Sequence, residues 1–243
     1  MNHLFTPLLP RDPLEPPVLV LAAHPDDEVI GAGAMLAWHG RRGHAVTVVH
    51  VTDGARGDPN DRENDICAVR RREGVEALRR LGLGPARHWD MPDGELPEHL
   101  DALAGRLREL FEEVAPRTLY SFWFGEAHRD HRALARAAAL ASVALPADCR
   151  CLLYGVNQLV PGGTLFDTTD TYPIKYHALK AYASQNAYID LPGMSEHRDR
   201  AVTVNLDIDG VMQGEMFVDL KPAELPQVYE RATELQRILL RDS

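Results

Sequence analysis

The sequence predicts an α/β domain whose mostly parallel sheet is covered by helices on both faces. Short apolar runs alternate with helical patterns at least four times along the chain, and the first run is continuously apolar, as in a strand buried on both sides. The length of 243 residues suits one domain with a sizeable core. Because no linker or internal repeat is evident, we expect residues 1–243 to form a single domain.

The first strand is expected at 18–21, where the chain reads Val-Leu-Val-Leu. A helix should follow it, because Val29, Ile30 and Leu36 share one helical face. Pro25 and the acidic residues beside it suit the first turn of that helix. In open α/β sheets the functional sites lie where strands end and helices begin, so this junction is a candidate site.

The middle of the chain repeats the pattern of strand and then helix. Apolar side chains recur at helical spacing from Leu100 to Val114, and Pro116 ends that helix. Gly82 ends the helix before it. The other elements are expected as strands at 45–52, 87–89, 118–124 and 151–156, a loop at 53–61, and helices at 65–81 and 130–145.

The two ends of the chain are less regular. Residues 1–16 are rich in proline and are expected to form an extended lead-in. A loop is expected at 157–171, a helix at 174–184 and a strand at 202–206. We interpret residues 157–243 as a C-terminal cap or sheet extension rather than a second domain.

Composition narrows the possible partners and location. The formal net charge is −10 and no long Lys/Arg run occurs, so nucleic acid is not an expected partner. The N-terminal segment lacks the pattern of a signal peptide, and no stretch is apolar and long enough to predict a membrane span. Three cysteines without a C-x-x-C pair favour a reducing compartment, so we expect a cytoplasmic protein.

Two clusters of His and Asp follow strands, and together they predict a metal site. The first is His24-Pro25-Asp26-Asp27-Glu28, and the second is His128-Arg129-Asp130-His131. A catalytic zinc ion takes three nitrogen or oxygen ligands and keeps one position open for water. His24, Asp27 and His131 would supply these ligands for one Zn²⁺ per chain, although another divalent metal such as Fe²⁺ could serve.

The remaining residues of the two clusters suit amide hydrolysis. Asp26 is the candidate general base that takes the proton of a metal-activated water. His128 would stabilise the tetrahedral intermediate or protonate the leaving amine, and Asp130 would orient an imidazole.

The pair A-H-P-D-D-E and H-x-D-H resembles the zinc-dependent de-N-acetylases of the LmbE/PIG-L family. The resemblance implies a Rossmann-like fold, a small N-acetylated glycoside as substrate, and the same ligands and base as above. It extends through Arg70-x-x-Glu73-x-x-x-Ala77-x-x-x-Leu81-Gly82 and Asp93-Gly94, and implies that Arg70 and Asp93 bind substrate. Two positions depart from the family pattern: Arg129 replaces a proline, and Glu126 stands where some members have a tyrosine.

Several alternatives and open points accompany this interpretation. Arg56 is a further candidate substrate contact. A dinucleotide site is disfavoured, because the first strand–helix turn carries carboxylates where phosphate would need bare glycines. A non-haem iron oxygenase is disfavoured by the α/β pattern. An N-acyl hydrolase of a non-sugar or antibiotic amide and a non-catalytic sugar-binding relative remain open, as do the aglycone and the formation of a homo-oligomer.

Overall fold

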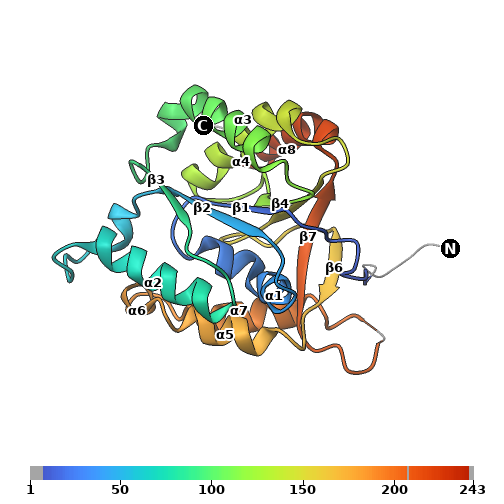
Figure 1. The fold of residues 1–243 in the computed structure, drawn as a ribbon, viewed down its shortest axis with the longest axis horizontal. Helices are drawn as coiled ribbons and strands as arrows, with labels where there is room; N and C mark the ends of the chain where they lie inside the picture. Colours follow the sequence, from blue (N-terminus) through green and yellow to red (C-terminus); the bar gives the residue numbers. More distant parts are fainter. Residues whose placement is uncertain (1–7, 207, 241–243) are drawn as a thin grey trace.

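The computed structural model describes residues 8–206 and 208–240, and a seven-stranded sheet runs through its centre (Figure 1). The strand order is β3-β2-β1-β4-β5-β7-β6. The first five strands of that order are parallel, and β7 runs antiparallel to both of its neighbours. The predicted mostly parallel α/β fold is therefore confirmed. The strands are β1 (Val18–Ala22), β2 (Val46–Thr52), β3 (Arg87–Met91), β4 (Thr118–Phe122), β5 (Arg150–Tyr154), β6 (Thr164–Asp167) and β7 (Gly214–Leu220).

Helices cover both faces of the sheet, as Figure 1 shows. Helices α3, α4 and α8 lie on one face, and α1, α2, α5 and α7 lie on the other. The α-helices are α1 (Asp27–Arg41), α2 (Ile66–Arg80), α3 (Leu100–Val114), α4 (Arg129–Ala141), α5 (Tyr172–Leu179), α6 (Ala183–Asn186), α7 (Leu191–Ala201) and α8 (Leu225–Leu240). Short 3₁₀ turns are η1 (Ala55–Gly57), η2 (Leu96–His99), η3 (Ser142–Ala144) and η4 (Pro222–Glu224). Within the described ranges, no helix combines the length and apolar composition needed to cross a bilayer.

Helix α1 is enclosed between the sheet and α5. Every residue from Asp27 to His39 is buried, so the helix is enclosed around its circumference rather than along one stripe. Gly31 permits the close approach to the sheet, because a Cβ at this position would lie 2.1 Å from the ring of Tyr154. The helix that begins at the candidate site therefore has little freedom to shift.

The predictions for the last third were wrong in part. No strand forms at 202–206, because the chain turns after α7 and the hydroxyl of Thr203 donates to the carbonyl of Arg200. The predicted loop at 157–171 contains β6, whereas β7 and α8 were not predicted. The helix predicted at 174–184 is divided into α5 and α6. Elsewhere the predicted strands and helices are present, with ends that differ by a few residues.

A buried ion cluster joins this C-terminal part to α1. The ammonium group of Lys175 lies 2.5 Å from Asp199 and 2.7 Å from Glu215, and all three side chains are at most 3% exposed. The carboxylate of Glu215 also accepts hydrogen bonds from the backbone amides of Ala34 and Met35 in α1, each at 2.9 Å. Lys175 thus pairs with two buried carboxylates, and Arg198 lies 3.6 Å from one of them, Asp199.

Replacing Lys175 with methionine should strongly destabilise the protein, because it leaves the buried Glu215 without its ion-pair partner and Asp199 with Arg198 alone, at 3.6 Å. We expect a loss of about 3–5 kcal/mol in the free energy of unfolding, measured by urea denaturation. Lys180→Met is the matched control: Lys180 is exposed and its ammonium lies over the ring of Tyr176, so the loss should stay below about 1 kcal/mol. Equal losses in the two variants would contradict the role given to the cluster.

Candidate metal centre and active site

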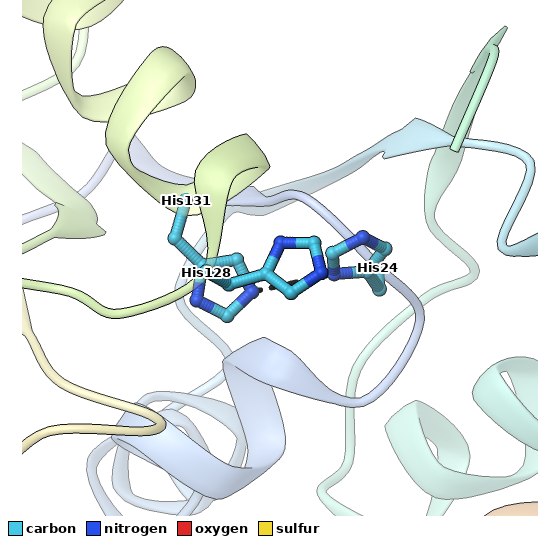
Figure 2. Close-up of side chains that lie close together, drawn as sticks. All are labelled: His24, His128 and His131. Carbon is cyan, nitrogen blue, oxygen red and sulfur yellow. Dashed lines mark hydrogen bonds between the residues drawn. The ribbon is translucent and has the colours of Figure 1, made fainter. Parts of the chain in front are cut away.

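The site lies at the carboxyl ends of β1 and β4, two parallel strands that pair directly. The order of strands reverses between them, because the chain proceeds from β1 toward β2 and β3 and returns to the other side of β1 at β4. His24 follows β1 in the loop before α1, whereas His128 and His131 lie at the start of α4. Figure 2 shows the three imidazoles converging from these two elements.

His24, Asp27 and His131 form a small triangle, in which each oxygen of the Asp27 carboxylate faces one of the two imidazoles. Nδ1 of His24 lies 3.2 Å from Oδ2 of Asp27 and 3.3 Å from Nε2 of His131. Nε2 of His131 lies 3.2 Å from Oδ1 of Asp27. Ligands bound at roughly 2.0–2.1 Å around a tetrahedral ion are separated from one another by roughly 3.3 Å, so these spacings fit a tetrahedral metal site.

The second nitrogen of His24 faces carboxylates. Its Nε2 lies 3.0 Å from Oδ1 of Asp93 and 3.3 Å from Oδ2 of Asp130. Carboxylates accept hydrogen bonds, so Nε2 carries the proton and Nδ1 directs its lone pair at the triangle. Asp130 is itself fixed by the backbone amides of Gly94 and Leu96, at 2.6 and 3.1 Å. The expected position of Asp130 behind an imidazole is therefore observed.

His131 is oriented in the same way by Glu126. Oε2 of Glu126 lies 2.7 Å from Nδ1 of His131, and the ring of Phe122 stacks on the imidazole with centroids 4.2 Å apart. The Glu126 carboxylate also accepts hydrogen bonds from backbone amides in the loop after β5, those of Val156, Asn157 and Gln158. Glu126 was noted in the sequence as a departure from the family pattern. Its acidic side chain near the second histidine cluster was the available signal for this role.

With the other nitrogen of each imidazole facing a carboxylate, three electron-pair donors face one another at the triangle. Such an arrangement is unfavourable unless a cation lies between them. The pKa values agree: burial alone would lower the pKa of His131, but Asp27 and Glu126 raise it to about 9. Burial opposes ionisation of Asp27 as well, yet His131 and His24 hold its pKa well below its usual range. The site therefore demands positive charge, and its donor set fits a divalent metal.

Asp26 lies beside the triangle in a strained backbone conformation. It precedes α1 with φ 136° and ψ −29°, which a residue with a Cβ rarely adopts. Its Oδ2 accepts a hydrogen bond from Arg70 at 3.2 Å, and its side chain is 10% exposed. Burial raises the pKa of Asp26 to about 7, although the charge of Arg70 opposes this rise. A carboxylate with such a pKa suits proton transfer near neutral pH.

Arg70, expected from the resemblance to bind substrate, lies against the carboxylate of Asp26. Its guanidinium donates to the carbonyl oxygens of Gly54 and Pro25 as well as to Asp26, and the residue is 4% exposed. The structure thus places most of the donor capacity of Arg70 on the protein itself. Asp93, also expected at the substrate, has both carboxylate oxygens engaged, one by His24 and one by the amide of Arg56 at 2.9 Å.

His128 presents one nitrogen to the protein and leaves the other available. Its Nδ1 accepts a hydrogen bond from the backbone amide of Asp130 at 3.2 Å, which caps the start of α4. In the neutral ring the proton then resides on Nε2. Burial, together with the nearby His24 and His131, lowers the pKa of His128, which favours this neutral donor form.

A pocket of about 280 Å³ opens above these groups. Arg56 lines it, and the Arg56 side chain is 60% exposed and pairs with Glu95. Ile189, between α6 and α7, also lines it, as do Leu191 and Met194 in α7, and sequence reasoning did not anticipate these three residues. The side chains that line the pocket include those of His24, Asp26, Asp27, Ile30, Arg56, Arg70, Asp93, His128, Arg129, His131, Val156, Asn157, Gln185, Ile189, Leu191 and Met194.

Comparison with known proteins identifies the family. Residues 19–142, which contain both histidine clusters, match the family described as PIG-L: GlcNAc-PI de-N-acetylase. The chain belongs to the PIG-L family. The PIG-L family is one of metal-dependent de-N-acetylases, so this member is a hydrolase that acts on an amide.

Two curated relatives show the range of named activities in the family. One is a probable N-acetyl-alpha-D-glucosaminyl L-malate deacetylase 2 of Bacillus anthracis, 31% identical over 185 residues that cover 70% of this chain and 81% of the relative. Another is a 1D-myo-inositol 2-acetamido-2-deoxy-alpha-D-glucopyranoside deacetylase of Streptomyces avermitilis, 32% identical over 157 residues. The match covers 51% of this chain and 53% of that enzyme, so the chain spans about half of its length.

A solved structure supports the fold of this PIG-L member. The N,N'-diacetylchitobiose deacetylase from Pyrococcus horikoshii superposes with a TM-score of 0.73, covering 85% of this chain and 84% of that one. Its sequence identity of 23% supports the shared fold alone.

The strain at Asp26 can be tested by comparing Asp26→Gly with Asp26→Ala. Alanine retains the positive φ penalty and glycine removes it, so we expect the glycine variant to be more stable than the alanine variant by roughly 1–2 kcal/mol in urea denaturation. Both variants lose the carboxylate and should be inactive. A glycine variant no more stable than the alanine variant would show that this backbone is unstrained.

Glu126→Gln should weaken metal binding, because the amide is a poorer partner for Nδ1 of His131 than the carboxylate. We expect the affinity for a divalent metal to fall roughly 10–100-fold in a chelator competition. Glu112→Gln, an exposed position on α3, is the matched control and should bind metal as the parent does. Unchanged affinity in Glu126→Gln would remove Glu126 from the metal site.

Proposed function

We propose that the protein is a zinc-dependent hydrolase that removes the N-acetyl group of an N-acetylglucosamine-type substrate, giving acetate and a free amine. The triangle formed by His24, Asp27 and His131 beside Asp26 carries the proposal. The two curated relatives support N-acetylglucosamine as the sugar of the substrate, since both names specify an acetylated glucosamine and differ in the attached group.

We assign the metal to His24, Asp27 and His131, one ion per chain. Two imidazole nitrogens and one carboxylate in tetrahedral spacing, with room for a further ligand in the pocket, suit Zn²⁺. The same donor types also accept Fe²⁺, so the choice depends on measured metal content and reactivation. A divalent ion bound here would acidify a coordinated water and polarise the carbonyl oxygen of the acetamide.

One trio with close donor atoms, His24, His128 and His131, contains both imidazoles of the triangle, and a further trio, His24, Asp93 and Asp130, contains one of them. We assign it no metal, because its carboxylates already accept hydrogen bonds from His24 and from backbone amides. These hydrogen bonds suit a supporting role, in which Asp93 and Asp130 hold the imidazole of His24 toward the ion.

Asp26 acts as the proton carrier in the proposed reaction. Arg70 occupies its Oδ2, which leaves Oδ1 to accept a proton from the water that attacks the carbonyl carbon. The same proton then passes to the nitrogen as the C–N bond breaks, so acetate and amine are released. Arg70 is thus a positioning residue that fixes the base, and the backbone strain at Asp26 holds the carboxylate toward the pocket.

His128 stabilises charge on the carbonyl oxygen. With Nδ1 fixed by the amide of Asp130, its Nε2–H is the group that can donate into the pocket. Such a donor favours the oxyanion of the tetrahedral adduct over the planar amide, and one donor of this kind contributes on the order of 10²–10³ in kcat.

The assigned roles predict different failures for Asp26→Asn and His131→Ala. Asp26→Asn should retain its metal and lose roughly 10²–10⁴-fold in kcat for acetate release from an N-acetylglucosamine glycoside, because the base is removed. His131→Ala should lose both metal and activity. Asp101→Asn, an exposed carboxylate on α3, is the control. Equal metal loss in Asp26→Asn and His131→Ala would contradict the division between base and ligand.

Metal removal provides an independent test of the cofactor. Acetate release should stop after chelation and return on addition of Zn²⁺, with a stoichiometry of one ion per chain. Recovery with Fe²⁺ and not with Zn²⁺ would overturn the assignment of zinc while leaving the ligand set intact. Full activity after exhaustive chelation would overturn the metal-dependent reaction.

A further inference from the structure

One side of the pocket mouth is apolar. Ile189 and Met194 line the pocket and remain 56% and 38% exposed, while Leu191 lies between them in sequence and is 4% exposed. Ile30 and Val156 line the pocket as well and are buried. An exposed isoleucine and methionine beside buried apolar neighbours form a surface that a ligand would cover with a gain in hydrophobic free energy.

This apolar wall is held in place by hydrogen bonds. The amide of Leu191 donates to the side chain of Asn186 at 3.2 Å, and Asp190 caps α7 by accepting from the amide of Gly193 at 3.0 Å. The side chain of Gln185, which also lines the pocket, donates to the carbonyl of Gly57 at 3.1 Å. The wall is therefore fixed relative to the metal centre rather than carried on an untethered loop.

The charges around the mouth disfavour an anionic group. Among the described residues that line the pocket, each arginine already faces a carboxylate: Arg56 with Glu95 at 3.4 Å, Arg129 with Glu98 at 2.5 Å, and Arg70 with Asp26. No lysine lines the pocket within this described part of the chain. A dianionic group such as malate would share these arginines with carboxylates that already face them.

We propose that Ile189 and Met194 form a subsite for an apolar aglycone, so that the preferred substrate is an N-acetylglucosamine glycoside with an aromatic or aliphatic attached group. This inference rests on the proposed function, because it requires the acetamide to lie at the metal. The substrate class then differs from those named for the two relatives, in which the attached group is a dicarboxylate or a polyol.

The test compares glycosides that share the sugar and the anomer. Acetate release is measured with the benzyl, methyl and L-malyl glycosides of N-acetylglucosamine and the zinc-loaded enzyme. We expect kcat/KM for the benzyl glycoside to exceed that for the methyl glycoside on the order of tenfold, mainly through KM, and the malyl glycoside to rank no higher than the methyl one. A malyl glycoside that is preferred over the benzyl one would overturn the proposal.

Variants of the apolar wall test whether Ile189 and Met194 cause the preference for the benzyl glycoside. Ile189→Ser and Met194→Ser should each reduce the benzyl-to-methyl ratio toward one. Val143→Ser, at a position 86% exposed on η3 and outside the pocket, should leave that ratio as in the parent. A methyl glycoside with an N-hexanoyl group distinguishes binding on the acyl side from binding on the aglycone side. If the longer acyl chain raises kcat/KM and the benzyl group does not, the assignment to the aglycone fails.

A binding measurement separates this inference from the proposed reaction. Calorimetry with the Asp26→Ala variant, which should bind without turnover, should show a lower Kd for the benzyl than for the methyl glycoside. If no glycoside releases acetate with the parent enzyme, the proposed function fails, whereas the calorimetric ratio still decides whether the apolar subsite exists. Equal Kd values for the two glycosides would overturn the subsite even if the enzyme is active.

Discussion

The direct pairing of β1 with β4 is the constraint on which the active site depends. Parallel strands present their carboxyl ends at the same edge, so the loop after β1 and the start of α4 must meet there. His24 and His131, 107 positions apart in the sequence, are brought within 3.3 Å by this one feature of the topology. The other contacts in the site fix the orientation of side chains that the strand pairing has already brought together.

Carboxylates provide the contacts that orient the site's side chains. Asp130 and Asp93 support His24, and Glu126 supports His131. In the first turn of α1, the buried Glu28 accepts from His50 at 3.0 Å and from the amide of Asp26 at 3.4 Å. Each imidazole and the strained backbone of Asp26 are thus fixed before any substrate enters, which is the preorganisation that electrostatic catalysis requires.

The sequence was sufficient for features that depend on local pattern. The alternation of strands and helices predicted the sheet, and the ligand-type residues directly after β1 and β4 predicted which side chains would meet. Features that depend on where a distant segment packs could not be predicted from the sequence. The alternating valines near 202–206 resemble a strand, yet Thr203 forms a turn there, and β7 is formed by residues 214–220 instead. Nor does local pattern indicate that the guanidinium of Arg70 lies on Asp26, or that the segment from α6 to α7 reaches the pocket.

The hydrogen bonds from Ala34 and Met35 to Glu215 bear on how the molecule can be divided. The segment that matches the family, residues 19–142, includes α1 but not β7, so a fragment cut to that segment would strip those amides of their acceptor. The same fragment would lack Arg198, which donates to the carbonyl of Ile30 in the same helix. Helix α1 in the full chain is therefore held by residues on both sides of that boundary, and gene fusions or permutations of this protein should keep both parts in one polypeptide.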